Sequence, residues 1–147
     1  GDPGIIPRAI QSIFSKVNQQ NSEIKASYFE LYNEQINDLL DSSKQSLELR
    51  ESNNKGVFVE NLTEVTLKNE NHFLELLTKG DNNRKIAETK LNDKSSRSHC
   101  VFRLEIRNCK VKSILNLVDL AGSENVSKAN TQGIRFKEGS NINKSLL

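Results

Sequence analysis

The feature that most constrains the fold is an almost continuous apolar run at residues 114–118, Ile-Leu-Asn-Leu-Val. A run of this kind favours a central strand covered on both faces, because a strand at the surface would alternate apolar and polar side chains. Asp119 follows the run directly, and Gly122 comes three residues later. The sequence therefore predicts a buried strand that ends in a polar turn containing glycine.

The rest of the chain alternates between helical and extended patterns. Apolar residues recur at helical spacing in residues 5–17 and 71–87, whereas residues 101–106 alternate as in a half-buried strand. We further predict strands at residues 26–32, 47–50, 57–59 and 64–67, a helical turn at 35–40, and a helix from 136 to 147. Strands that alternate with helices predict an α/β sheet, in which ligands lie beyond the carboxyl ends of the strands. Two polar segments, residues 92–99 and 119–124, are expected there.

Composition limits the classes of function. The 147 residues contain 21 Lys plus Arg and 19 Asp plus Glu, which gives a net charge of +2. This charge is too small to produce the strong positive potential that is typical of a nucleic-acid-binding protein. No apolar run approaches the ~18 residues of a membrane span. Cys100 and Cys109 have no CxxC spacing, so we expect reduced thiols of a cytosolic protein and no zinc site. The hydrophobic content of 35% is low for a single domain, and predicts that part of the fold lies outside the chain.

The segment Asp-Leu-Ala-Gly-Ser-Glu at residues 119–124 has the chemistry of a phosphate sensor. An Asp at the end of a strand can hold the water shell of Mg²⁺, and a Gly lets the backbone N–H approach a terminal phosphate without a Cβ. This Asp-x-x-Gly pattern is typical of the second switch of NTPases. Taken alone, a strand that ends in an Asp/Gly turn explains the pattern equally well.

The segment Asn-Asp-Lys-Ser-Ser-Arg-Ser-His at residues 92–99 offers complementary groups. Serine hydroxyls can bind Mg²⁺ and a phosphate oxygen, and Arg97 can bind a carboxylate through two hydrogen bonds. A polar surface loop or a kinase target site would account for this segment by itself. Together, one segment supplies hydroxyls and an Arg, and the other supplies an Asp, a Gly and a Glu.

With these motifs in order, the chain resembles the motor domain of kinesins. The other resembling stretches are Pro-Gly-Ile-Ile-Pro-Arg-Ala (3–9), Glu-Leu-Tyr-Asn-Glu (30–34), Lys-Glu-Gly (137–139) and Asn-Ile-Asn-Lys-Ser-Leu (141–146). The pair Ser-Ser-Arg-Ser-His and Asp-Leu-Ala-Gly-Ser-Glu is far more specific than either short pattern. The resemblance implies that residues 1–147 are part of a kinesin motor domain, nearest the centromere-associated branch. It implies an α/β P-loop NTPase fold with a central mixed sheet flanked by helices.

The resemblance also implies roles for the matching residues, with ATP and Mg²⁺ as cofactors. Asn92, Ser95 and Ser96 match the first switch, with Ser96 as a Mg²⁺ ligand. Asp119 matches the position that binds Mg²⁺ through water, and Gly122 the γ-phosphate sensor.

Arg97 and Glu124 match the ion pair that closes the two switches around the attacking water. His99 is expected to support its loop, without acting as an acid or base.

By the same resemblance, the partner is the microtubule, which implies a location in the cytoplasm and on the cytoskeleton. Lys128, Lys137 and Lys144 match the loop and helix that face the microtubule, and Lys55 is a further candidate in the turn of a small strand pair. Tubulin has an acidic surface, which suits these charges. A solvated face is the alternative for some of these lysines. Dimerisation would use regions outside this chain.

The departures from the kinesin pattern matter as much as the matches. No Gly-x-x-x-x-Gly-Lys-Ser/Thr occurs in the sequence, so we expect the phosphate cradle to precede Pro3. The chain alone is then expected not to turn over ATP. The apolar strand is also expected to lack one neighbour, which predicts poor solubility or self-association.

Two alternatives remain open from the sequence. A catalytically inactive kinesin-like module that only binds microtubules would match the same motifs. A fragment of a regulatory GTPase would need a guanine-reading Asn-Lys-x-Asp, which is absent.

Overall fold

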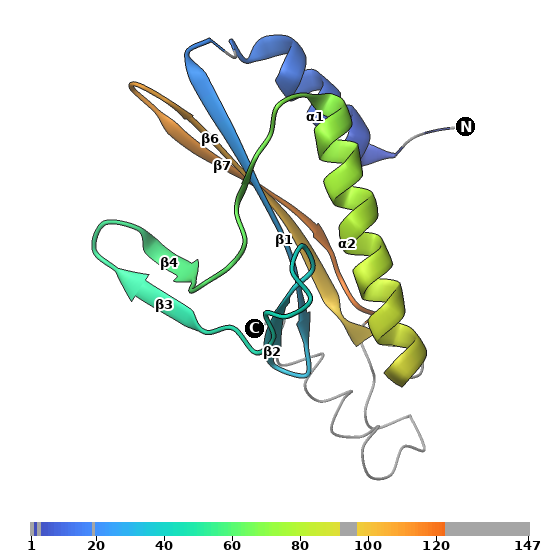
Figure 1. Ribbon diagram of the computed structural model, residues 1–147. Coiled ribbons are helices and arrows are strands. Elements are labelled where there is room, and N and C mark those ends of the chain that lie inside the picture. Colours follow the sequence, from blue (N-terminus) through green and yellow to red (C-terminus); the bar gives the residue numbers. More distant parts are fainter. Residues whose placement is uncertain (1, 3, 19, 92–96, 123–147) are drawn as a thin grey trace.

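The structure, a computed structural model, describes residues 2, 4–18, 20–91 and 97–122 (Figure 1). The helix predicted at residues 136–147 lies outside this part. The described elements are α1 (Ile5–Lys16), β1 (Ser22–Tyr32), β2 (Gln35–Asp38), β3 (Leu49–Ser52), β4 (Gly56–Val59), β5 (Val65–Thr66), α2 (Glu70–Leu91), β6 (His99–Asn108) and β7 (Lys112–Asp119). None of the described helices is long and apolar enough to cross a membrane.

The main sheet has the strand order β2-β1-β6-β7, and β5 adds to β1. Every described strand pair is antiparallel. In the register of β1 with β6, Leu31 lies opposite His99, and in that of β6 with β7, Cys100 lies opposite Asp119. The carboxyl ends of β1 and β7 therefore meet the beginning of β6 at one end of the sheet. The α/β class predicted from the sequence is confirmed.

The core lies between the sheet and the two helices, which both cover the same face (Figure 1). Helix α1 contributes the fully buried Ile10, and α2 contributes Phe73. The ring of Phe73 lies with its centroid 5.0 Å from that of Phe102 on β6, and Phe102 lies 5.1 Å from Tyr28 on β1. This aromatic column joins α2 to the two longest strands of the sheet.

Helix α2 passes through Gly80 without a break, although the sequence indicates a weak point there. A Cβ built on Gly80 would overlap the ring of Tyr28. The glycine therefore lets α2 lie close against β1, and the packing compensates for its poor helix propensity.

Strands β3 and β4 form a separate two-stranded hairpin on the other side of the sheet from the helices (Figure 1). The predicted strand pair is confirmed, although β3 begins and ends two residues later than the predicted 47–50, and Ser52 lies opposite Gly56 at the turn. Gly56 has a φ of 65°, a conformation that glycine adopts without strain. Leu49 and Val57 on this hairpin are 61% and 59% exposed.

The helical turn predicted at residues 35–40 is wrong, because residues 35–38 form β2. Asn33 and Glu34 have φ values of 53° and 64°, which make a two-residue hairpin turn of the kind that matches strand twist. Gln35 consequently pairs with Tyr32, and the chain returns along β1.

The prediction that residues 114–118 are covered on both faces is also not met in the described part of the chain. There, β7 pairs only with β6 and forms an edge of the sheet. Leu115 and Leu117 pack against the core, whereas Ile114 and Val118 are 46% and 53% exposed. One face of the strand is covered by the helices and the other is open among the described residues.

Candidate functional site

The structure describes four of the predicted site residues: Arg97, Asp119, Gly122 and Lys55. The others lie outside the described residues, namely Asn92, Ser95, Ser96, Glu124, Lys128, Lys137 and Lys144. The expected pairing of Arg97 with Glu124 is therefore not tested by the structure.

The antiparallel pairing of β6 with β7 brings the two predicted switch segments together. Ser98 and His99 lie at the beginning of β6, and both are buried. Asp119 ends β7 opposite Cys100, so residues 97–99 and 119–122 lie at the same end of the sheet. This juxtaposition was expected from the sequence, although the argument there placed both segments at the carboxyl ends of strands, whereas residues 97–99 lie at the beginning of β6.

His99 connects these two segments directly. The backbone N–H of Ala121 donates a hydrogen bond of 2.9 Å to Nδ1 of His99. Both residues are buried, at 3% and 7% exposure. His99 therefore supports the loop that follows β7, as the sequence suggested, and it holds the residue next to Gly122.

Arg84 on α2 is a site residue that the sequence analysis missed. Its Nη2 donates to Oγ of Ser98 at 3.1 Å, and its Nη1 lies 3.6 Å from Oδ2 of Asp119. The Arg84 side chain is only 14% exposed, whereas that of Asp119 is 73% exposed. One guanidinium thus contacts both segments and holds the Asp119 carboxylate from its protein side, while the rest of that carboxylate faces solvent.

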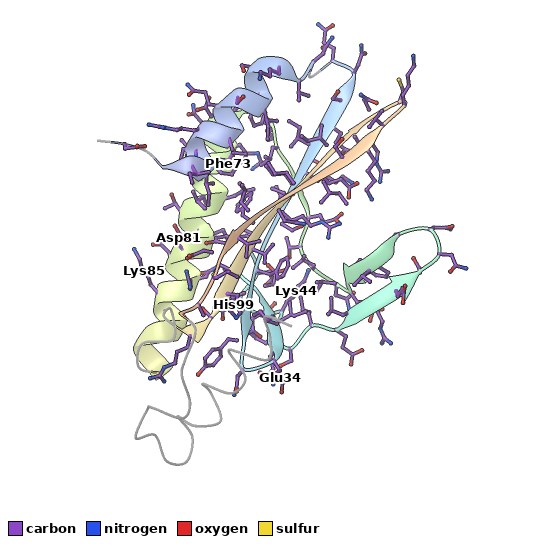
Figure 2. All side chains as sticks on the ribbon, turned by 180° about the vertical axis from the view of Figure 1, so that it is seen from behind. Glu34, Lys44, Phe73, Asp81, Lys85 and His99 are labelled. Atoms are coloured by element: carbon purple, nitrogen blue, oxygen red, sulfur yellow. The ribbon has the colours of Figure 1, made fainter. Side chains whose placement is uncertain are left out.

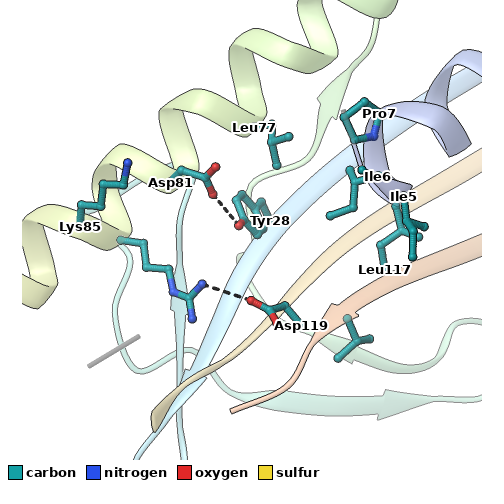
Figure 3. Close-up of a pocket in the computed structure, with 12 residues that line it drawn as sticks. Ile5, Ile6, Pro7, Tyr28, Leu77, Asp81, Lys85, Leu117 and Asp119 are labelled. Atoms are coloured by element: carbon teal, nitrogen blue, oxygen red, sulfur yellow. Dashed lines mark hydrogen bonds and ion pairs between the residues drawn. The ribbon is translucent and has the colours of Figure 1, made fainter. Parts of the chain in front are cut away.

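A second polar contact joins α2 to the sheet beside Arg84. The hydroxyl of Tyr28 donates a 2.8 Å hydrogen bond to Oδ1 of Asp81 (Figure 3). Burial, with smaller contributions from Cys100 and Asp81, raises the pKa of Tyr28 well above its usual range. Tyr28 therefore stays neutral and donates to Asp81 throughout the physiological pH range.

A signal for Arg84 was present in the sequence. Phe73, Leu77, Asp81 and Arg84 follow at spacings of four, four and three, which places them on one helix face. The apolar part of this face enters the core, and its polar continuation reaches the end of the sheet. The run Asn82-Asn83-Arg84-Lys85 hides the signal, because it reads as a solvated surface.

A cavity of about 730 Å³ opens beside these residues (Figure 3). Its apolar wall comes from the beginning of α1, from α2 and from β7, and its polar wall contains Asp81, Arg84, Lys85 and Asp119. The labelled side chains in Figure 2 show Asp81 and Lys85 on α2 and His99 at the end of the sheet. Asp119 is the last residue of β7 and lines this cavity, and its carboxylate oxygens are accessible to solvent.

The buried thiol of Cys100, which lies beside this site, is unreactive at neutral pH. Cys100 is 3% exposed, and burial raises its pKa to about 12, although Arg84 acts in the opposite direction. A thiol with this pKa carries almost no thiolate at neutral pH, so it is not a nucleophile. Both cysteines are free, and the described residues contain no cluster of three or more His, Cys, Asp or Glu side chains able to hold a metal ion.

Lys55 lies apart from Asp119, in the turn of the β3–β4 hairpin. Its Nζ lies 5.2 Å from the centroid of the Phe58 ring, which is the geometry of a cation–π contact. The backbone N–H of Lys55 donates to Oγ of Ser52 at 3.2 Å. The structure therefore contains two separate regions. One is the end of the sheet, which is held by the contacts of Arg84 and His99, and the other is a projecting hairpin with Lys55 at its turn.

Comparisons with known proteins identify related sequences and structures. The family model described as kinesin motor domain matches residues 1–147. Kinesin-related protein 3 of Dictyostelium discoideum is 47% identical over 97% of this chain, which is 13% of that protein. Centromere-associated protein E of Homo sapiens, from the branch suggested by the sequence, is 44% identical over 98% of this chain and 6% of that protein.

Solved structures give the same result. A fast kinesin, solved to study its ATPase mechanism and interactions with microtubules, superposes with a TM-score of 0.83 and 36% identity. The match covers 95% of this chain and 42% of that one. A KIF14 dimer with AMP-PNP in complex with a microtubule gives a TM-score of 0.77 and 38% identity over 98% of this chain and 46% of that one. On these sequence and structural matches, this chain belongs to the kinesin motor domain family.

Proposed function

We propose that residues 1–147 are the switch-containing part of a motor domain that couples ATP hydrolysis to microtubule binding and movement. One observation carries the proposal: Arg84 and His99 join the two segments that match the kinesin switches. The chain spans 13% and 6% of the two curated relatives and under half of the solved motors. The activity is therefore proposed for a longer protein that also supplies the phosphate cradle.

Mg²⁺ with ATP fits the residues present. Mg²⁺ keeps most of its water shell and is usually held by one or two carboxylates together with substrate phosphates. Asp119 offers such a carboxylate, exposed at the end of a strand and at a cavity. In the proposed site, Asp119 acts through water and Ser96 through its hydroxyl, and Asn92, Ser95 and Gly122 bind the nucleotide. The bound ion would neutralise phosphate charge during hydrolysis.

The described residues act by positioning. Arg84 contacts both the Asp119 carboxylate and Ser98, and so holds the distance between the two switch segments constant. His99 fixes Ala121, which leaves the neighbouring Gly122 to move its backbone toward or away from a terminal phosphate. Arg97 then pairs with Glu124 to close the site and orient the attacking water. Such preorganised groups commonly provide much of the rate enhancement in phosphoryl transfer.

Microtubule binding is proposed for Lys55, Lys128, Lys137 and Lys144. Exposed charges are screened by salt within about 8–10 Å, so their contribution is expected to fall as salt increases. In this proposal, residues 125–138 run from the Gly122 turn into the segment that carries Lys137, and so link the phosphate state to the microtubule contact along the chain.

The test uses the complete motor region with the substitutions Arg97→Ala, Glu124→Ala and both together. Loss of a transition-state contact is expected to lower microtubule-stimulated kcat by about 10²–10³-fold, with little change in ATP binding. The double variant should be no worse than either single one, because the two residues act as a unit. Arg107→Ala is the matched control, since the exposed Arg107 pairs with the largely buried Glu105 at the other end of β6.

Small and additive effects at Arg97 and Glu124, similar to that at Arg107, would contradict the proposed roles. A complete motor region that binds microtubules without turnover would instead support the inactive module. The isolated chain of 147 residues is expected to show no turnover in the same assay.

A further inference from the structure

Asp38, at the end of β2, is a buried carboxylate that the proposed chemistry does not use. It is 1% exposed. Its Oδ1 accepts hydrogen bonds from the backbone N–H groups of Leu40 at 2.8 Å and Asp41 at 3.1 Å. Its Oδ2 accepts from the backbone N–H of Thr63 at 2.8 Å. Both oxygens of one side chain are therefore engaged by main-chain donors from two separate segments.

These segments are the two roots of the β3–β4 hairpin. Leu40 and Asp41 begin the connection that leads into β3, and Thr63 lies on the connection that leaves β4. Lys44 adds a second link between the roots, because its Nζ donates to Oγ1 of Thr63 at 3.1 Å and its carbonyl accepts from the Asp38 N–H at 3.0 Å. Asp38 is thus the point through which the entering and leaving chains are held together.

The hairpin needs such an anchor. A two-stranded hairpin is marginally stable by itself, and β3 has little buried surface. In the described part of the chain, the only bridge from the hairpin's approach to the main sheet is the isolated pair Ile36 and Leu47. The direction of the hairpin is therefore set at its roots, where Asp38 lies.

The hairpin also has the surface of an interaction element. It projects from the side of the sheet opposite the helices (Figure 1). It carries the exposed Leu49 and Val57, with the exposed Lys55 at its turn. Exposed apolar residues beside a cation suit an acidic protein surface. We propose that Asp38 is a positioning residue that fixes the direction of this hairpin, and through it the contact of Lys55 with the microtubule. The microtubule part of this inference rests on the proposed function.

The chemistry of the site calls for a carboxylate. In Asp38→Asn, one side-chain oxygen becomes an NH₂ group that cannot accept a hydrogen bond. If that group faces Thr63, the connection that leaves β4 loses its hydrogen-bond acceptor. If it faces Leu40 and Asp41, the connection that leads into β3 loses its acceptor instead. Either orientation loosens one root with almost no change in side-chain volume.

Hydrogen exchange tests the positioning role without any partner. In Asp38→Asn, the amides of residues 47–60 are expected to exchange about tenfold faster, as for loss of roughly one hydrogen bond. Asp41→Asn is the matched control: it removes the same charge from the same loop, but the Asp41 carboxylate accepts hydrogen bonds from Ser43 and lies 4.0 Å from Nζ of Lys44, so its contacts stay within the entering root. Thr63→Val leaves Asp38 intact and should give a smaller increase. Unchanged hairpin exchange in Asp38→Asn, or an equal increase in Asp41→Asn, would overturn the proposal.

Co-sedimentation of the complete motor region with microtubules tests the partner. Asp38→Asn and Lys55→Ala are each expected to lower microtubule affinity, and the double variant should be no weaker than Lys55→Ala alone. A purely structural role would instead give additive losses. If the wild-type protein does not bind microtubules, the proposed function and the partner assignment both fail, and the exchange experiment still decides the positioning role.

Discussion

The helix-covered face of the sheet and the β3–β4 hairpin are held in place by different means. On the covered face, Phe73, Phe102 and Tyr28 form a buried aromatic column, and Arg84 and His99 extend the contacts to the end of the sheet. The hairpin has exposed side chains and is fixed at its roots by hydrogen bonds. The difference teaches that the helix-covered face depends on a packed apolar core, whereas the end of the sheet and the hairpin roots depend on a few polar contacts.

The same substitution in the two regions gives the largest expected contrast. Phe102 is 1% exposed, and Phe102→Ala leaves a cavity between α2 and the sheet. We expect it to lower the free energy of unfolding by about 3–5 kcal/mol, as is usual for large core residues. Phe58→Ala on the hairpin should cost much less, because its ring is only half-buried. Urea unfolding of both variants measures the contrast, and equal costs would show that the hairpin is also part of the core.

Sequence reasoning reached the covered face more easily than the hairpin roots. Helical spacing identified α1 and α2, and alternation identified β6, because periodic burial leaves a direct trace in the sequence. It missed β2, since Asn33 and Glu34 adopt positive φ without a glycine to signal it. Asp38 was missed because its partner Thr63 is 25 residues away in sequence, and no local pattern records such a pair. Arg84 was missed because the polar run around it hides its place on the inward face of α2.

The end of the sheet is expected to show an intermediate effect that depends on one acceptor atom. His99→Leu removes the partner of the buried Ala121 N–H, which should cost about 1–3 kcal/mol. His99→Asn can place its side-chain oxygen near the position of Nδ1, so it should recover a substantial part of this loss. Urea unfolding and exchange at the Ala121 amide measure both variants. If His99→Asn is as damaging as His99→Leu in both measurements, His99 acts by filling space and does not hold the loop after β7.

The smallest effect is expected on the hairpin. Val57 is 59% exposed, so the hydroxyl introduced by Val57→Thr would remain in water and need no buried partner. Threonine also keeps the β-branched shape that suits a strand. We therefore expect the free energy of unfolding to change by less than about 0.5 kcal/mol, as for most surface substitutions. The measurement is urea unfolding at two protein concentrations. A loss above about 1 kcal/mol that grows with concentration would mean that Val57 is buried in solution against a second copy of the chain. In that case the hairpin would be stabilised by packing after all, and its contrast with the helix-covered face would hold only for a single copy.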